Sequence, residues 1–159
     1  MAAQTIPISA YAALSGDDAS VAEFFFHMFP DGLGFLPLGH QILIVGSASS
    51  VIQSDARFQD FLSVNASRTH VLGELSTADR GQLIAAAACV IIPPGALRPG
   101  NPDMANAIRN GRPIVTAHDG SPRSNPIPAG VSIAETPADF RRLIRQELNG
   151  DLDRARRAL

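Results

Sequence analysis

The chain has 159 residues, of which 45% are hydrophobic and 18% charged, and its formal net charge is −2 at pH 7. This composition excludes a disordered polypeptide and gives no reason to expect nucleic acid or an anionic membrane as a partner. No apolar run is long enough to span a membrane, and residues 1–14 lack the basic start of a signal peptide. Cys89 is the single cysteine, so no intrachain disulfide can form, and a reducing, cytoplasmic setting is expected.

Six short β-rich runs follow one another along the chain, and most of them are apolar throughout rather than alternating. That pattern is typical of strands buried on both faces of a parallel sheet. Glycine or proline turns end several of these runs. The predicted strands are Ile8–Leu14, Gln41–Val45, Thr69–Leu72, Cys89–Ile92, Pro113–Ala117 and Val131–Ala134.

Helix signals lie between these runs. Ser76 and Thr136 are caps followed three residues later by an acidic side chain, and Asn101 precedes a proline suited to the first helical position. A further helix is predicted over Ala19–Met28, with the cluster Phe24-Phe25-Phe26 assigned to the core. The arginine-rich C-terminal end is interpreted as a solvated helix face. Strands alternating with helices predict a single α/β Rossmann-like domain over 1–159, with about six parallel strands and helices on both faces.

Ligands of such sheets bind beyond the carboxyl ends of the strands. Small or polar residues occupy those ends here, and the turn Gly100-Asn101 precedes a helix N-terminus, which favours an anion. The chain has no Walker-type loop, no nucleophile elbow, and no histidines at metal-ligand spacing. Gly32-Leu33-Gly34 lacks the features of a dinucleotide fingerprint. We therefore expect a ligand site without metal or cofactor.

Residues 70–148 resemble the C-terminal, donor-nucleotide domain of group 1 (family 4-like) GT-B glycosyltransferases. The resemblance rests on His70–Ser76, on Ile84–Ile92 with Pro93-Pro94, on Gly100–Ile108, and on Gly111-Arg112-Pro113-Ile114-Val115. It implies binding of a UDP- or GDP-sugar and transfer of a hexose, with a separate acceptor-binding domain as partner. The implied donor-binding residues are Gly46, Ser47, Gly73, Glu74, Gly100, Asn101, Met104, Asn106 and His118.

Within that resemblance, Gly73 and Glu74 are expected near the base, Asn106 near the ribose, and the amides of Gly100–Met104 near the diphosphate. The family carries two glutamates eight positions apart, and the matching residues here are Arg98 and Asn106. Gly16-Asp17-Asp18 stands where the family has a basic pair. Because of these departures, no catalytic residue is assigned. The chain alone is not expected to catalyse the transfer. The departures favour the alternative of a non-catalytic interaction or regulatory module that keeps the fold.

Overall fold

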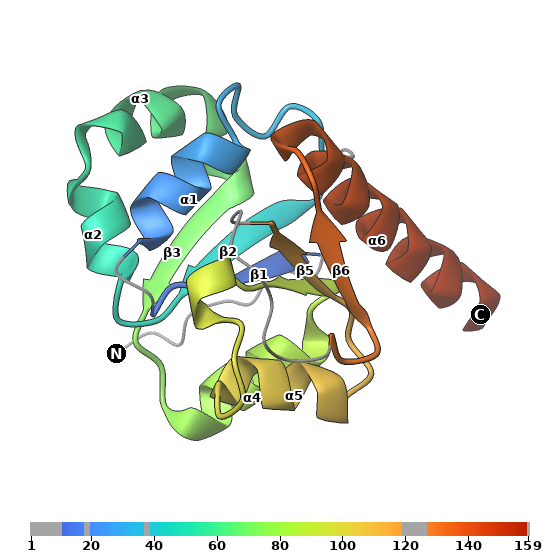
Figure 1. Ribbon diagram of the computed structural model, residues 1–159. Coiled ribbons are helices and arrows are strands. Elements are labelled where there is room, and N and C mark those ends of the chain that lie inside the picture. Colours follow the sequence, from blue (N-terminus) through green and yellow to red (C-terminus); the bar gives the residue numbers. More distant parts are fainter. Residues whose placement is uncertain (1–10, 18–19, 37–38, 119–126, 159) are drawn as a thin grey trace.

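The computed structural model describes residues 11–17, 20–36, 39–118 and 127–158. Its centre is a six-stranded parallel sheet with the order β3-β2-β1-β4-β5-β6 (Figure 1). The strands are β1 (Tyr11–Ser15), β2 (Gln41–Val45), β3 (Thr69–Gly73), β4 (Cys89–Ile91), β5 (Ile114–Ala117) and β6 (Val131–Ala134). The predicted Rossmann-like α/β fold is confirmed.

The central strands are apolar because neither of their faces meets water. Residues 12–14 of β1, 42–45 of β2 and all of β4 are fully buried. The predicted ends of the strands agree with the structure within one residue, except that Ile8–Ala10 of the first predicted strand lie outside the described residues. Continuous apolar runs thus located the strands correctly.

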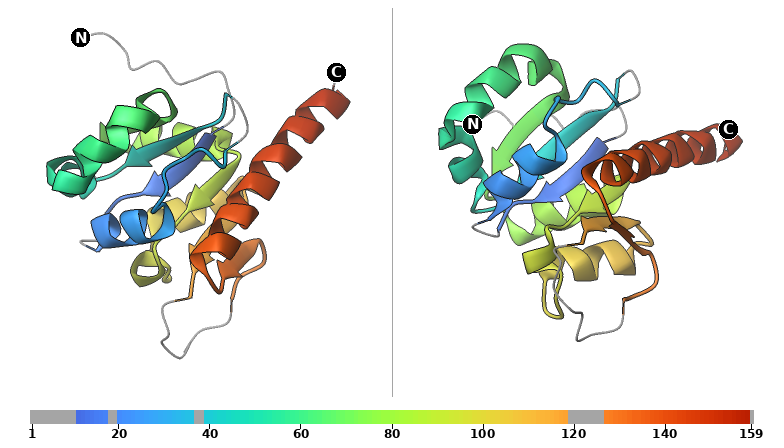
Figure 2. Two further views of the ribbon diagram at one scale, coloured as in Figure 1. Left: turned by 90° about the horizontal axis from the view of Figure 1, so that it is seen from above. Right: turned by 45° about the horizontal axis from the view of Figure 1, so that its top comes forward.

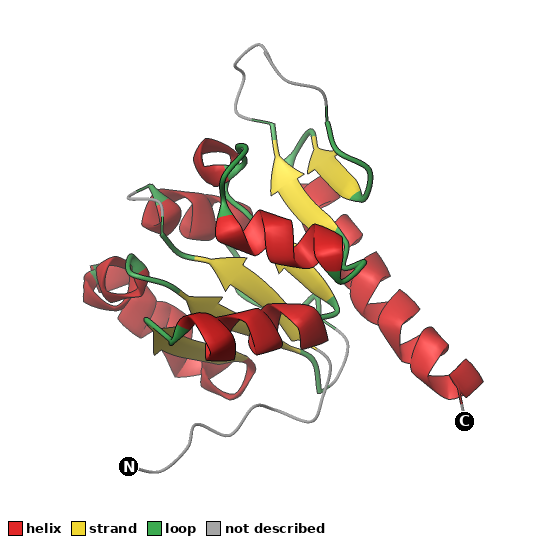
Figure 3. Ribbon diagram, turned by 90° about the horizontal axis from the view of Figure 1, so that it is seen from below, coloured by secondary structure: helices red, strands yellow, loops and turns green. Residues whose placement is uncertain are grey.

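Helices cover both faces of the sheet. They are α1 (Val21–Met28), α2 (Ser49–Ser54), α3 (Ala56–Asn65), α4 (Thr77–Ala86), α5 (Pro102–Arg109) and α6 (Pro137–Ala158), with short 3₁₀ turns at Ala66–Arg68 and Pro94–Ala96. The core on one face joins α1, α2, α3 and α6 to the strands, and the core on the other face joins α4 and α5 (Figures 1 and 3). The C-terminal part of α6 extends beyond the sheet (Figure 2).

The predicted caps form. Ser76 Oγ accepts a hydrogen bond from the amide of Asp79, and Thr136 Oγ1 accepts one from the amide of Asp139. Asn101 caps α5 ahead of Pro102, and Gly111, at φ +65°, follows the end of that helix. Side-chain acceptors satisfy amides that a helix N-terminus leaves without intrahelical partners, which is why these local signals located three helices.

Helices α2 and α3 were not anticipated from the sequence. Both are short, α2 is mostly polar, and each helix buries few residues: Ser49 and Ile52 in α2, and Phe58, Phe61 and Asn65 in α3. So narrow an apolar stripe does not stand out in a sequence window. Asp55 caps α3 through the amide of Arg57, at 2.9 Å, which is the local signal that could have located its start.

Phe24 and Phe25 lie in the core, as predicted. Phe25 is fully buried and meets Phe26, Phe29 and Phe61 edge to face, with ring centroids 5.0–5.2 Å apart. Phe24 packs on Phe140 of α6. Phe26 is only partly buried. The cluster therefore joins α1 to α3 and α6 and leaves one ring at the surface.

Candidate functional site

The residues predicted to bind a ligand come from several strands but lie mostly along one edge of the sheet. All six strands are parallel, so the turns after β2, β3, β4 and β5 gather at their shared carboxyl edge. From β1 the chain passes to β2 on one side, and from β4 it passes to β5 on the other, although β1 and β4 are neighbours. This reversal of strand order is where open α/β sheets form a ligand crevice. We call this region the carboxyl-edge crevice.

Gly46 and Ser47 form the turn after β2 and hold a carboxylate. The amide of Ser47 donates a hydrogen bond to Oδ1 of Asp17, at 2.9 Å, and its hydroxyl donates another at 3.3 Å. Gly46 has φ +122°, and a Cβ atom there would lie 2.3 Å from the same Asp17 oxygen. The backbone conformation therefore favours glycine at this position, and a larger residue would displace the Asp17 carboxylate.

Arg80, in the first turns of α4, bridges two carboxylates. Its Nη2 and Nη1 donate to Asp17 at 2.7 and 3.3 Å, and its Nε donates to Asp103 at 2.8 Å. Nη2 also donates to Asp103, so both edges of the guanidinium are occupied. Asp103 is 1% exposed, whereas the side chain of Asp17 is 42% exposed. One end of this network is thus buried and the other reaches solvent.

The protonation of the network follows from these contacts. Burial acts to raise the pKa of Asp17, but the hydrogen bonds from Ser47 and Arg80 outweigh it and hold the pKa below its ordinary value. Burial acts to lower the pKa of Arg80, but Asp103 and Asp17 raise it further above its ordinary value. Asp17 therefore remains ionised and Arg80 protonated at neutral pH.

Two predicted glycines leave open space over the backbone. Gly73 has φ +70° and Gly100 has φ +92°, and a Cβ at either position would meet no described atom within 4 Å. Gly73 also accepts a hydrogen bond from the amide of Gly46, at 2.8 Å, which ties the turns after β2 and β3 together. Glu74, the next residue, is exposed. The space that a Cβ would occupy is therefore open at both turns.

The N-terminus of α5 is capped within the chain. Asn101 Oδ1 accepts hydrogen bonds from the amides of Asp103, at 2.9 Å, and Met104, at 3.1 Å. These are two of the amides expected to face a diphosphate, and in this structure they have an internal partner. Met104 is only partly exposed and packs against the core beneath α4 and α5.

Asn106 and His118 are not among the residues that bond Asp17 or Arg80 in the ion network. Asn106 accepts a hydrogen bond from Arg109, at 3.0 Å, and its side-chain nitrogen would lie 3.9 Å from a Cβ on Gly81 of α4. His118 is exposed after β5 and pairs through its amide with Ala134 of β6. Arg98, which matches the first family glutamate, is exposed. The ligand roles predicted for these residues stay predictions.

Sequence analysis did not assign the side chains of Asp17, Arg80 and Asp103 to the site. The Arg80–Asp17 and Arg80–Asp103 contacts span 63 and 23 residues, so no short motif contains them. One local signal was present: Arg80 places a positive charge near the N-terminus of a helix, where the helix dipole disfavours it. Such a residue implies carboxylates close by.

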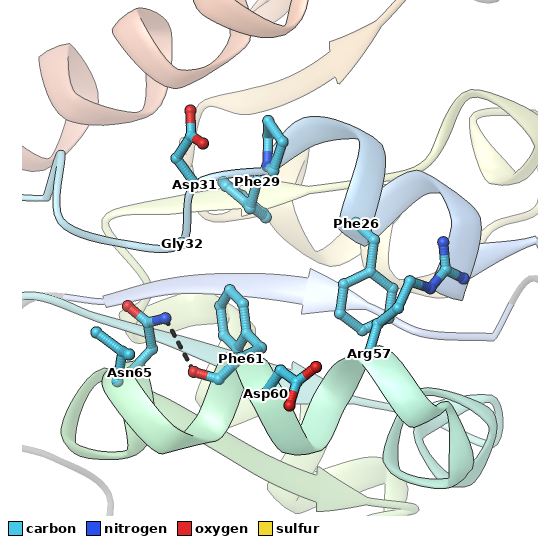
Figure 4. Close-up of a pocket in the computed structure, with 10 residues that line it drawn as sticks. Phe26, Phe29, Asp31, Gly32, Arg57, Asp60, Phe61 and Asn65 are labelled. Atoms are coloured by element: carbon cyan, nitrogen blue, oxygen red, sulfur yellow. Dashed lines mark hydrogen bonds between the residues drawn. The ribbon is translucent and has the colours of Figure 1, made fainter.

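A concave region lies between α1 and α3. This α1/α3 groove has a volume of about 550 Å³ (Figure 4). Its lining residues are Phe26, Phe29, Pro30, Asp31, Gly32, Arg57, Asp60, Phe61, Val64 and Asn65. Asn65 closes one end by accepting a hydrogen bond from the amide of Leu33 and donating one to the carbonyl of Phe61, both at 2.9 Å.

The α1/α3 groove has an excess of negative charge. Arg57 lies 4.5 Å from the centre of the Phe26 ring and forms ion pairs with Glu23, at 2.7 Å, and Asp55, at 2.8 Å. Its hydrogen bonds hold the pKa of Asp55 at about 2. Asp31 and Asp60, by contrast, have no ion-pair partner among the described residues. Val64 beside them is 82% exposed.

Other kinds of site find no support in the described part of the chain. No group of three or more metal-ligating side chains occurs there. Cys89 is buried in β4. Within the described residues, no helix is both long and apolar enough to cross a bilayer.

Comparison with known proteins identifies the fold. No family model and no curated protein matches this sequence. The apo form of WaaB, a lipopolysaccharide outer core galactosyltransferase, is 16% identical with a TM-score of 0.54, and the match covers 90% of this chain and 41% of that one. AviGT4, a glycosyltransferase involved in avilamycin A biosynthesis, is 17% identical with a TM-score of 0.47, covering 89% and 42%. The β subunit of eIF2B from Chaetomium thermophilum is 14% identical with a TM-score of 0.42, covering 71% and 37%. This chain spans less than half of each of them, and the likeness to WaaB supports a shared Rossmann-like fold.

Proposed function

We propose that this chain is a nucleotide-binding domain whose ligand occupies the carboxyl-edge crevice. The observation that carries the proposal is the reversal of strand order between β1 and β4, with open backbone turns at Gly73 and Gly100 on either side of it. Small residues there let a ligand approach the backbone closely. The guanidinium of Arg80 supplies a cation at the same edge.

The ligand class we propose is a UDP- or GDP-sugar. The base would lie over Gly73 and Glu74, the ribose near Asn106, and the diphosphate between the Ser47 turn and the start of α5. His118 would border the sugar. Support comes from the resemblance of residues 70–148 to donor domains of glycosyltransferases and from the fold shared with a galactosyltransferase. In a complete enzyme a hexose would be transferred with retention as fixed donors stabilise the leaving diphosphate. An acceptor-binding domain would be needed for turnover.

Calorimetric titration with UDP, GDP and their hexose conjugates tests this proposal. We expect micromolar binding of one nucleotide series, weakened about tenfold by Asn106→Ala through loss of a ribose hydrogen bond. Asn149→Ala on the exposed side of α6 is the matched control and should leave binding unchanged. The absence of heat with every nucleotide, from a sample with the circular dichroism of a folded α/β protein, would contradict the proposal.

A second candidate function is protein interaction through the α1/α3 groove. Its aromatic floor and the two unpaired carboxylates, Asp31 and Asp60, fit a helical segment carrying apolar and arginine side chains. This candidate corresponds to a non-catalytic interaction or regulatory module. Such a segment would bury Val64, which is otherwise 82% exposed.

A fluorescent amphipathic peptide with leucines at i, i+3 and i+7 and two arginines tests this candidate. Asp31→Asn combined with Asp60→Asn should weaken its binding about tenfold, as should Val64→Ser. Asp79→Asn, on the opposite face, is the control. Equal binding of a scrambled peptide of the same composition would contradict a specific groove site.

A further inference from the structure

Asp17 occupies a ring of hydrogen-bond donors at the carboxyl-edge crevice. Its two oxygens accept from the Ser47 amide at 2.9 Å, the Ser47 hydroxyl at 3.3 Å, and Arg80 at 2.7 and 3.3 Å. The donors come from the turn after β2 and from α4, whereas Asp17 follows β1. A carboxylate bound by an amide, a hydroxyl and a guanidinium is held as an anionic ligand would be.

Two further features show that these donors form a built site. Asp103, 1% exposed, binds the far edge of the Arg80 guanidinium and fixes its plane. Ser49, near Gly16 and so near Asp17, is buried: its hydroxyl has no hydrogen-bond partner among the described residues, and it would lie 3.5 Å from a Cβ on Gly16. A buried hydroxyl without a partner is rare and indicates unused hydrogen-bonding capacity at this point.

The two carboxylates of the network differ in their freedom to leave. Asp103 is enclosed by the protein, so its departure from Arg80 would leave a buried charge unpaired. The Asp17 side chain is 42% exposed and can turn into solvent, where water replaces its hydrogen bonds. Only Asp17 can therefore exchange readily with a ligand anion.

We infer that the donors of Ser47 and Arg80 form a phosphate site and that Asp17 is its internal competitor. The inference rests on the proposed nucleotide function and adds to it the residues that bind the diphosphate and the means by which affinity is restrained. A phosphate group of the ligand takes the place of the Asp17 carboxylate, while Arg80 stays on Asp103. In the absence of ligand, Asp17 occupies the site in most molecules. The apparent affinity for the ligand is therefore the intrinsic affinity multiplied by the fraction of molecules in which Asp17 has left the site.

The test measures binding of inorganic pyrophosphate and of UDP to the wild-type chain and to Asp17→Asn. Loss of the competing charge should tighten binding of both probes about tenfold. Asp79→Asn removes the same charge one residue from Arg80 without freeing a donor, and should change affinity less than about twofold because exposed charges are screened. In the Asp17→Asn background, Arg80→Gln with Asp103→Asn removes guanidinium and buried carboxylate together, so that no charge is stranded. In this variant the tighter binding of both probes should be lost. When Arg145→Gln on α6 is combined with Asp17→Asn instead, the tighter binding should remain.

Each result separates the two proposals. If Asp17→Asn tightens pyrophosphate but UDP binds no better than pyrophosphate, the phosphate site stands and the nucleotide proposal fails. If UDP binds equally to wild type, Asp17→Asn and the variant lacking Arg80, the nucleotide proposal stands and the inference about Asp17 is overturned. Equal effects of Asp17→Asn and Asp79→Asn also overturn it, since net charge alone would explain them. Absence of binding by every folded variant overturns both.

Discussion

The carboxyl-edge crevice and the α1/α3 groove are built by opposite means. In the crevice, directional hydrogen bonds and ion pairs join Asp17, Ser47, Arg80 and Asp103, which lie far apart in the sequence. Beside the groove, edge-to-face rings join α1 to α3. Fixed donors favour one charged group in one orientation, whereas apolar walls accept varied shapes. This difference underlies the two proposals, a small anionic ligand for the first region and a helical segment for the second.

The largest expected effect lies on the groove side. Phe25→Ala should lower the free energy of unfolding by about 4 kcal/mol, because it leaves a cavity among Phe26, Phe29 and Phe61. Phe26→Ala, which removes a partly buried ring from the groove wall, should cost about 1–2 kcal/mol. Urea unfolding followed by circular dichroism measures both. Equal losses would show that the two rings are equally embedded.

On the crevice side, Arg80→Ala should lower the free energy of unfolding by about 3 kcal/mol, because Asp103 would remain buried without its partner. Adding Asp103→Asn should recover most of the loss, since the remaining group is neutral. Chemical denaturation of the two variants gives the comparison. If the double variant is no more stable than Arg80→Ala, the stranded charge is not the cause.

A smaller effect is expected at the start of α5. Asn101→Ala removes the acceptor for the amides of Asp103 and Met104 and should cost about 1 kcal/mol. Asn101→Ser, which retains a capping oxygen, should recover part of it. Thermal unfolding of the three proteins tests this order of stability. If Asn101→Ser is destabilised as much as Asn101→Ala, the effect would come instead from loss of the hydrogen bond that the Asn101 side chain donates to the carbonyl of Ala96.

The smallest effect concerns acid. The pKa of Asp17 lies below 3.8 in the folded chain, so the folded state binds fewer protons than the unfolded state near that pH. The stability from Asp17 is therefore complete above pH 3.8 and is lost as the pH falls through its lower, folded value. Unfolding curves of wild type and Asp17→Asn should converge as the pH falls below 4. A gap that stays constant with pH would mean that the Asp17 charge does not contribute.

The sequence by itself determined the strands, their parallel arrangement and three helix starts. Apolar runs such as Gln41–Val45 can be buried only where both faces of a strand are covered, and caps such as Ser76 act on amides two or three residues away. These are local constraints. The glycine turns at the carboxyl edge were predictable because they too are local. Gly73 and Gly100 adopt positive φ values, and glycine alone adopts them without strain.

Only the tertiary structure decided which side chains meet. Arg80 lies beside Asp17 because right-handed crossovers place α4 on the opposite face from α1 while β1 stays next to β4. Likewise α2 and α3 are stabilised less by their own sequences than by packing of Ile52, Phe58 and Phe61 onto α1 and the sheet. Ion pairs between residues distant in sequence leave no periodic trace, so the donors around Asp17 became visible only when the strand order was known.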